Sequence, residues 1–146
     1  MPIVSLFVYS DSAQPQPTPQ GNQLHIMNPQ HILRPKFIPG QFSFAITFGI
    51  LDFDISLPHS LRYTFSSPEG AKLIDTAESI QLPPFVNELM NDLPTDMQGF
   101  LTSLDFKNVV FETEGEYKSE IFIDGVSLGT THGIKVKRMK PNAPST

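Results

Sequence analysis

The clearest structural signal in the chain is the segment Gln41-Phe42-Ser43-Phe44-Ala45-Ile46-Thr47-Phe48-Gly49-Ile50. Large apolar side chains occupy every second position in it. Because successive side chains of a strand point to opposite faces of a sheet, this alternation predicts a strand with one face in the core. The phase then changes, since Leu51 and Phe53 are apolar and Asp52 is not. A strand changes its buried face only through an extra residue or a corner, so we expect a bulge or bend at residues 49–52.

The composition agrees with a β protein. The chain has 146 residues, which fits one domain, and it holds 14 prolines and 12 phenylalanines but no cysteine or tryptophan. Proline breaks helices and long ladders, and aromatic residues favour strands. This balance predicts short strands joined by many turns.

Residues 3–9 are rich in β-forming residues and predict a strand, and similar alternation predicts strands at 23–27, 61–65, 100–106 with a continuation at 109–111, and 116–123. A turn at residues 67–70 predicts a returning strand at 72–76. We expect a local irregularity near Lys107 and Asn108. Apolar residues at helical spacing predict one short helix at residues 86–93, which Pro94 ends. The expected fold is one all-β, two-sheet sandwich over residues 1–140, with seven to nine mostly antiparallel strands, followed by a flexible tail at 141–146.

Two segments between strands are rich in proline. Pro15, Pro17 and Pro19 alternate with polar residues and predict an extended, solvated loop. Residues 28–40 contain three more prolines and predict an irregular connection across the sandwich. Its expected anchors are Ile32, Leu33, Phe37 and Ile38.

Asp124-Gly125 is a strong hairpin signal, because a type I′ turn needs positive φ at both central residues. With this turn, Ile123 faces Val126 and Ile121 faces Leu128 on the returning strand. Gly129 and Gly133 suggest a bulge or a thin strand there.

Charges at the end of the chain have a structural interpretation. If the hairpin register ran on unbroken, Glu114 would oppose Lys135 and Glu112 would oppose Lys137. A turn at Gly115 would break that register but keep the opposite charges near one another. The basic residues Lys135, Lys137, Arg138 and Lys140 could contact phosphates, but we favour a role in protecting a sheet edge.

The stretch Thr113-Glu114-Gly115-Glu116-Tyr117 resembles the Asp-x-Gly-x-Tyr corner of immunoglobulin-like sandwiches. The resemblance implies an immunoglobulin-like fold, with Gly115 as the turn residue and Tyr117 bonding back to the main chain. Thr113 stands in place of the aspartate, and the cysteine and tryptophan landmarks are missing. The alternative is an ordinary turn followed by a tyrosine that only packs.

Three segments carry a wider resemblance: Met27-Asn28-Pro29, Pro35-Lys36-Phe37-Ile38-Pro39-Gly40 with Phe42-Ser43-Phe44, and Gly115-Glu116-Tyr117 through Asp124-Gly125. On these the chain resembles a group of small bacterial β-sandwich proteins with no assigned activity. The resemblance implies a β-sandwich and a bacterial or phage source.

Signals for chemistry are weak. His25, His31, His59 and His132 show no metal-ligand spacing, and no thiolate is present. Asp52 and Asp54 share a strand face and invite a calcium hypothesis, although such pairs usually face solvent. The chain has no Gly-x-Ser-x-Gly motif and no glycine-rich phosphate loop. We therefore expect no enzyme activity, no catalytic residue, no cofactor and no metal.

The net charge of −5 disfavours a nucleic-acid partner, and no apolar run is long enough to span a bilayer. The absence of cysteine fits a reducing compartment, so a cytoplasmic location is expected.

The sequence thus favours a non-catalytic binding or accessory module that acts through loops or an edge strand. We expect a protein partner or self-association, with the site at the loop of Pro15, Pro17 and Pro19 or in the loops between Asn28 and Pro39. The alternative is a small-ligand or carbohydrate-binding sandwich, assisted by calcium near Asp52 and Asp54.

Overall fold

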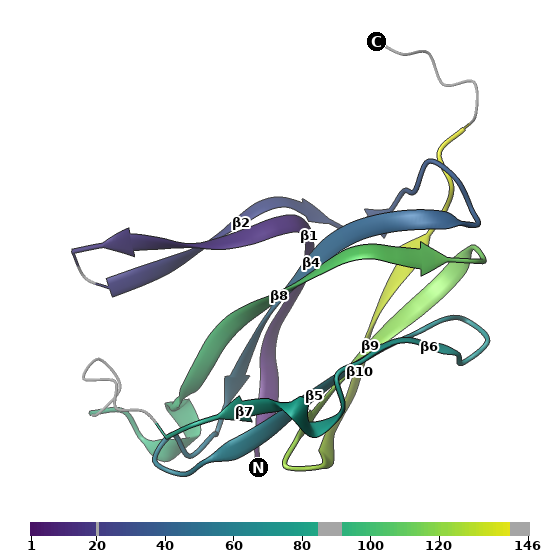
Figure 1. The fold of residues 1–146 in the computed structure, drawn as a ribbon. Coiled ribbons are helices and arrows are strands. Elements are labelled where there is room, and N and C mark those ends of the chain that lie inside the picture. Colours follow the sequence, from purple (N-terminus) through teal and green to yellow (C-terminus); the bar gives the residue numbers. More distant parts are fainter. Residues whose placement is uncertain (20, 85–91, 141–146) are drawn as a thin grey trace.

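The structure is a computed structural model that describes residues 1–19, 21–84 and 92–140. In these ranges ten strands form two sheets that pack face to face (Figure 1). The strands are β1 (Ile3–Thr18), β2 (Gly21–Gln30), β3 (Ile32–Leu33), β4 (Gly40–Leu51), β5 (His59–Ser66), β6 (Lys72–Asp75), β7 (Ile80–Leu82), β8 (Gly99–Phe111), β9 (Gly115–Ile123) and β10 (Val126–Val136). Two 3-10 turns, η1 (Ala77–Ser79) and η2 (Thr95–Met97), complete the described elements.

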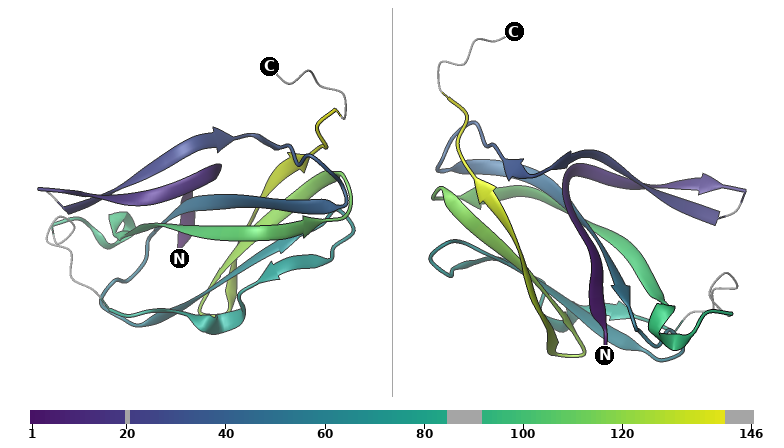
Figure 2. Two further views of the ribbon diagram at one scale, coloured as in Figure 1. Left: turned by 45° about the horizontal axis from the view of Figure 1, so that its top comes forward. Right: turned by 180° about the vertical axis from the view of Figure 1, so that it is seen from behind.

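The prediction of an all-β fold with two packed sheets is confirmed. One sheet has the antiparallel order β2-β1-β4-β8, and the other has the order β3-β10-β9-β5-β6, with β7 also pairing with β5. Figure 2 shows the two layers from other sides. The count exceeds the predicted seven to nine strands because β3 and β7 are too short to show a period. Within the described ranges, no helix is long and apolar enough to cross a membrane.

Two predictions fall on residues that the structure does not describe. The predicted helix at 86–93 lies mostly outside the described residues, and the predicted tail at 141–146 lies wholly outside them.

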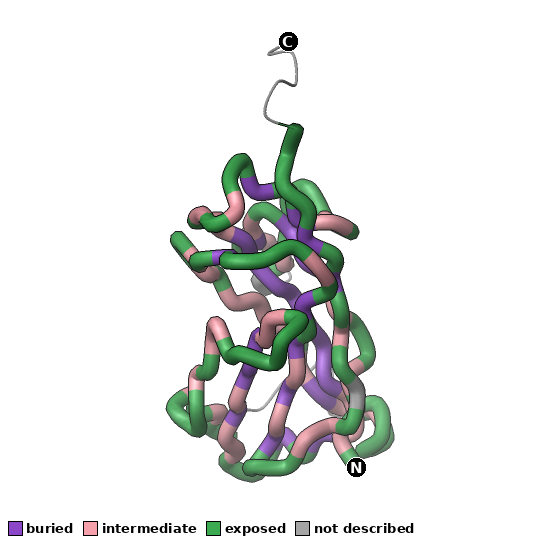
Figure 3. The backbone as a smooth tube through the Cα atoms, turned by 90° about the vertical axis from the view of Figure 1, so that its right-hand side faces the viewer, coloured by how far each residue is buried: buried purple, intermediate pink, exposed green. Residues whose placement is uncertain are grey.

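The alternation in the middle of the chain builds the core. Phe44, Ile46, Phe48 and Ile50 of β4 are at most 2% exposed. They face Tyr63 and Phe65 of β5 and Tyr117 of β9, which are also buried. Figure 3 shows that buried positions run along the strands, while the turns between them are exposed.

The change of phase after Ile50 is made by a corner. β4 ends at Leu51, and Asp52 takes a positive φ of 58°. The chain then crosses to the other sheet, with Phe53 and Ile55 buried between the layers. The bend expected at residues 49–52 is therefore confirmed.

Bulges set the register of both long C-terminal ladders. β8 carries one extra residue opposite β4, with Asn108 at φ 56°, as the sequence predicts. The Asp124-Gly125 turn and the pair of Ile123 with Val126 are also confirmed. After Ser127, however, the β9–β10 register shifts by two residues around Gly129, whose φ is 80°.

That shift corrects three predicted pairs. The regular ladder skips Leu128, so it does not pair with Ile121. Lys135 faces Glu116 rather than Glu114. Lys137 lies 3.7 Å from Glu114 rather than opposite Glu112. Lys135 and Lys137 still lie near glutamates, as predicted, because the shift moves each lysine to the glutamate two residues further along the chain.

The proline-rich loop is the clearest error of the sequence analysis. β1 continues through Pro15 and Pro17 to Thr18 and pairs with β2 as one hairpin. Backbone N–H groups alternate between the two edges of a strand, so prolines at every second position lack donors on one edge only. Among the described residues, β1 beyond Ser10 has β2 as its one partner strand, so its other edge needs no donors. The tip of this hairpin reaches away from the packed sheets (Figure 1).

The connection at residues 28–40 is partly regular. Its first residues belong to β2, and Ile32 and Leu33 form β3, which runs parallel to the end of β10. Leu33 is fully buried, as predicted, but Phe37 is 71% exposed and is no anchor.

The corner before β9 has the predicted hydrogen bond. The Tyr117 hydroxyl donates to the carbonyl of Thr113 at 2.7 Å. Gly115 takes a φ of 137°, which favours glycine at the turn.

Candidate binding groove between β1 and β4

A groove opens where β1 separates from β4. The ladder between these strands ends at the pair of Ser10 with Ala45. In the part of the chain that the structure describes, β4 continues back to Gly40 with β8 as its one partner strand, so its other edge is unpaired there over residues 40–44. Backbone donors and acceptors on such an edge are available to an added strand.

A cavity of about 490 Å³ lies at this point, and we call it the fork groove. Its lining residues are Asp11, Arg34, Lys36, Phe37, Gln41, Phe42, Ser43 and Met139. Phe37 and Met139 are 71% and 42% exposed, and Phe42 is partly buried against the Phe111 ring. The groove therefore combines exposed apolar side chains with an open strand edge.

Main-chain bonds hold the loop that forms one wall. The Leu33 and Pro35 carbonyls accept hydrogen bonds from the backbone N–H groups of Lys137 and Met139 at 3.1 and 2.9 Å. The Arg34 guanidinium donates to the carbonyls of Lys137 and Arg138. These bonds fix the base of the loop and leave its tip, with Phe37, in solvent.

The opposite wall is fixed by Asp11. Its carboxylate accepts hydrogen bonds from the side-chain amides of Asn28 and Gln30, at 2.7 and 3.0 Å. Both of its oxygens are thus engaged by side chains of β2, and its negative charge stays at the groove wall. In the described part of the chain, Arg34 and Lys36 form no ion pair, which leaves two cations at the groove.

The basic end of β10 does not play the expected role. Lys135 pairs with Ile32, and the chain beyond it bonds to Leu33 and Pro35, so this edge is already covered by backbone. The interpretation of these residues as edge protection is wrong here.

The two carboxylates considered for calcium have other partners. Asp52 accepts a hydrogen bond from the N-terminal ammonium group. Asp54 accepts from the backbone N–H of Ser56 at 2.9 Å and from its hydroxyl. Among the residues described, no three His, Asp or Glu side chains gather as a metal site.

His59 is the one histidine with a carboxylate partner in the described ranges. Its Nδ1 lies 2.6 Å from Asp124, and its Nε2 lies 2.8 Å from the carbonyl of Asp54. With an acceptor at each nitrogen, the ring has no lone pair directed at a nucleophile. This arrangement joins two loops and does not form a base for hydrolysis.

The hydrogen bonds of His59 predict a pH-dependent stability. Burial alone would lower the pKa of His59, but the bonds to Asp124 and Asp54 outweigh it and raise the pKa above its usual range. The stabilisation is fully present below the unfolded pKa of about 6.5 and is lost as the pH rises through the folded value. His59→Gln should therefore cost about 1 kcal/mol near pH 6 and less at higher pH.

Urea unfolding of the unchanged protein and of His59→Gln over a pH series measures this difference in the free energy of unfolding. The exposed His31 offers a control, and His31→Gln should leave the profile unchanged. A His59→Gln deficit that stays constant with pH would contradict the assignment.

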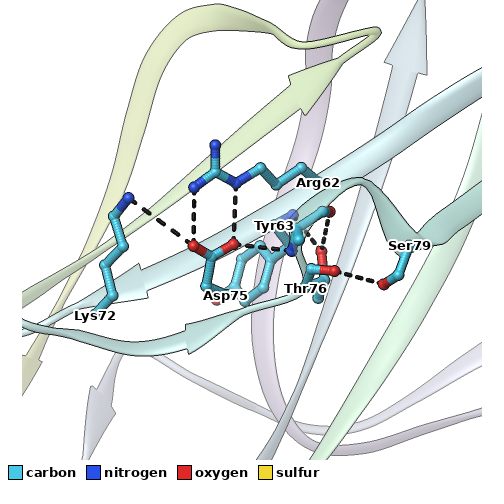
Figure 4. Close-up of polar contacts among 7 residues, drawn as sticks. Arg62, Tyr63, Lys72, Asp75, Thr76 and Ser79 are labelled. Atoms are coloured by element: carbon cyan, nitrogen blue, oxygen red, sulfur yellow. Dashed lines mark hydrogen bonds and ion pairs between the residues drawn. The ribbon is translucent and has the colours of Figure 1, made fainter.

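A polar cluster on the other side of the sandwich is structural (Figure 4). The Arg62 guanidinium donates two bonds to Asp75, at 2.9 and 2.8 Å, and Asp75 also accepts from the N–H of Ala77. The Arg62 bonds, followed by that N–H, hold the pKa of Asp75 well below its usual range. Thr76 accepts from the Tyr63 N–H, which ties the turn to β5. All these groups have partners within the fold.

Sequence reasoning predicted three of the eight residues that line the groove. It placed a site in the loops between Asn28 and Pro39, and Arg34, Lys36 and Phe37 line the groove. It missed Asp11, Met139 and the β4 edge at residues 41–43. Pro15, Pro17 and Pro19 do not lie at the groove wall but on the hairpin, exposed. The alternation of these prolines was the sequence signal for the open edge, because prolines at every second position are typical of a strand with one unpaired edge.

No protein-family model matches the chain, and no curated protein is significantly similar to it in sequence. The resemblance to small bacterial β-sandwich proteins therefore stays a prediction.

Proposed function

We propose that the protein is a non-catalytic binding module that takes an extended segment of a partner protein into the fork groove. The observation that carries this proposal is the unpaired β4 edge at residues 40–44 beside the exposed ring of Phe37. An added strand would gain main-chain hydrogen bonds from the edge, and side-chain contacts would supply specificity. Arg34 and Lys36 favour a segment that carries acidic residues.

We also propose that the sandwich is immunoglobulin-like. In that fold strands A, B and E share one sheet, and C, F and G share the other, with C′ added in some members. The neighbours β1-β4-β8 and β10-β9-β5-β6 match these orders, and β9 and β10 form the last hairpin. The bond from Tyr117 to Thr113 at the start of β9 supports the same assignment. The hairpin partner β2 is an addition to this plan.

Nuclear magnetic resonance on the full chain tests both proposals. The probe is a short peptide of alternating valine and glutamate, which is extended, apolar on one face and acidic on the other. We expect its amide shift changes to map to residues 34–37 and 41–43. Phe37→Ser should weaken binding at least about fivefold, because exposed aromatic anchors carry much of such affinity. Contacts between strands in the same spectra report the strand order.

The matched control is Leu57→Ser, which removes an apolar side chain that is 52% exposed and outside the groove. It should bind the peptide as the unchanged protein does. Equal losses from both variants, or shift changes away from the groove, would contradict the binding site. A strand order without β9 between β5 and β10 would contradict the fold assignment.

A further inference from the structure

His132 of β10 contacts β1 of the opposite sheet at two points. Its ring stacks on the Phe7 ring, with the ring centres 4.4 Å apart and the planes 4° from parallel. Its backbone carbonyl accepts a hydrogen bond of 2.7 Å from the Tyr9 hydroxyl. Phe7 and Tyr9 also contact each other edge to face, with their ring centres 5.2 Å apart. We call the contacts among these three residues the β1–β10 contact.

One nitrogen of the His132 ring has no hydrogen bond in this contact. Its Nε2 atom is buried and has no partner in the part of the chain that the structure describes. In a neutral imidazole Nε2 can be the nitrogen without a proton, so the contact then leaves one acceptor unused. A protonated ring carries an N–H on both nitrogens, and it would bury a donor and a positive charge without an acceptor. The contact therefore favours the neutral ring, and burial lowers the pKa of His132.

No anion lines the cavity beside this ring, among the residues that the structure describes. The cavity has a volume of about 450 Å³, and its titratable lining residues are Tyr9, His31 and His132 itself. Burial raises the pKa of Tyr9, so its hydroxyl stays neutral, and a protonated His31 would repel a charge on His132. The face of the Phe7 ring attracts a cation, but it gives no acceptor to an N–H in the plane of the imidazole.

The charged residues of the neighbouring strands do not face His132 either. In the β9–β10 ladder His132 pairs with Ser119, which is fully buried on the inner face. Because side chains alternate along a strand, the charged residues around this pair are on the outer face. They are Glu116, Lys118, Glu120 and Lys135. On β1, the Asp11 carboxylate is engaged by two side-chain amides of β2.

We propose that the β1–β10 contact is a pH-sensitive switch, which joins the two sheets while His132 is neutral and opens when His132 takes up a proton. Opening lets water solvate the charged ring, so protonation and opening favour each other. The stabilisation is fully present above the unfolded-state pKa of about 6.5 and is lost as the pH falls below that value. The sign is opposite to that of His59, whose hydrogen bonds favour the charged ring. None of the residues that line the fork groove takes part, so the switch does not depend on the proposed partner binding.

Denaturant unfolding of the full chain tests the energetic part of the proposal. His132→Phe keeps a flat ring on Phe7 but cannot take up a proton. Between about pH 7.5 and about pH 5, the equilibrium constant for unfolding should rise about tenfold more in the unchanged chain than in His132→Phe. His59 and the carboxylates are common to both proteins, so their contributions cancel. His31→Phe is the matched control and should keep the acid dependence of the unchanged chain.

Nuclear magnetic resonance on the unchanged chain tests whether protonation opens the contact. The ring shifts of His132 report its protonation, and the Overhauser signal between the Phe7 and His132 rings reports their nearness. This signal should weaken at least about twofold as the ring becomes charged, because it follows the population of the closed form. The signal between Phe44 and Phe65 in the core should stay unchanged.

Two results would overturn the proposal. One is a signal between Phe7 and His132 that keeps its full strength until the whole chain unfolds. The other is an equal effect of acid on the unchanged chain and on His132→Phe. Peptide binding to the fork groove at neutral pH should be the same in His132→Phe as in the unchanged chain, which separates the switch from the proposed function.

Discussion

Replacing Phe44 by alanine is expected to lower the free energy of unfolding by about 3–5 kcal/mol. Phe44 is 2% exposed, and its ring lies 5.1 Å from Phe65 and 5.6 Å from Phe106, measured between ring centres. Phe65 belongs to the opposite sheet, and Phe106 belongs to the neighbouring strand. The cavity left by alanine would therefore lie between the two layers, where ladders on both sides prevent collapse.

The chain offers a matched control for this change in Phe37, which is 71% exposed. Phe37→Ala removes the same atoms from water-exposed surface and should change stability by less than about 0.5 kcal/mol. Denaturant unfolding of both variants gives the two values. Similar costs for Phe44→Ala and Phe37→Ala would mean that the aromatic layer does not stabilise the fold as the structure indicates.

The parts of the fold that depend on local pattern could be predicted from the sequence. The alternation from Phe42 to Ile50 predicts which face of the strand is buried, and this prediction needs no knowledge of the partner strands. Asp124-Gly125 specifies a turn by the φ angles it allows. The corner after Leu51 was predictable for the same reason, because a change of phase is visible within one segment.

The features that depend on a partner strand could not be predicted in this way. Whether Pro15 and Pro17 lie in a loop or a strand depends on which edge of β1 is unpaired, and that is decided where β1 leaves β4. The two-residue shift at Gly129 moved each predicted charge pair, although both the glycine and the charges had been noted. A local signal gives the position of a bulge but not the number of residues that it adds.

The candidate site also has one part that local sequence pattern predicts and one part that depends on strand pairing. The loop residues Arg34, Lys36 and Phe37 lie in a segment whose prolines mark it as irregular, so a surface site could be predicted there. The β4 side of the groove is hidden in the most regular strand of the sequence, because Gln41 and Ser43 alternate like the residues that follow. Only the end of the β1 ladder at Ala45 distinguishes them.

Removing the hydroxyl of Ser119 is expected to cost about 2–3 kcal/mol, because it breaks a buried chain of hydrogen bonds between the sheets. Ser119 of β9 is fully buried and lies 2.6 Å from the hydroxyls of both Tyr9 and Tyr63. Tyr9 donates its single proton to the carbonyl of His132 at 2.7 Å. Ser119 must therefore donate to Tyr9, and Tyr63 must donate to Ser119. Burial raises the pKa of both tyrosines, so both hydroxyls stay protonated as this order requires.

A double-mutant cycle on Ser119→Ala and Tyr63→Phe measures the chain by denaturant unfolding. Ser119→Ala leaves the Tyr63 hydroxyl without an acceptor, whereas Tyr63→Phe removes that hydroxyl and leaves the bond from Ser119 to Tyr9 intact. The double variant has no orphaned donor on Tyr63, so it should be more stable than the sum of the two losses predicts, by about 1–2 kcal/mol. Ser103→Ala on the partly exposed face of β8 is the control and should cost less than about 0.5 kcal/mol. Strict additivity would show that the two hydroxyls act independently. A coupling of the expected sign would show that the Ser119 hydroxyl accepts the hydrogen bond of the buried Tyr63 hydroxyl, which an apolar residue at position 119 could not do.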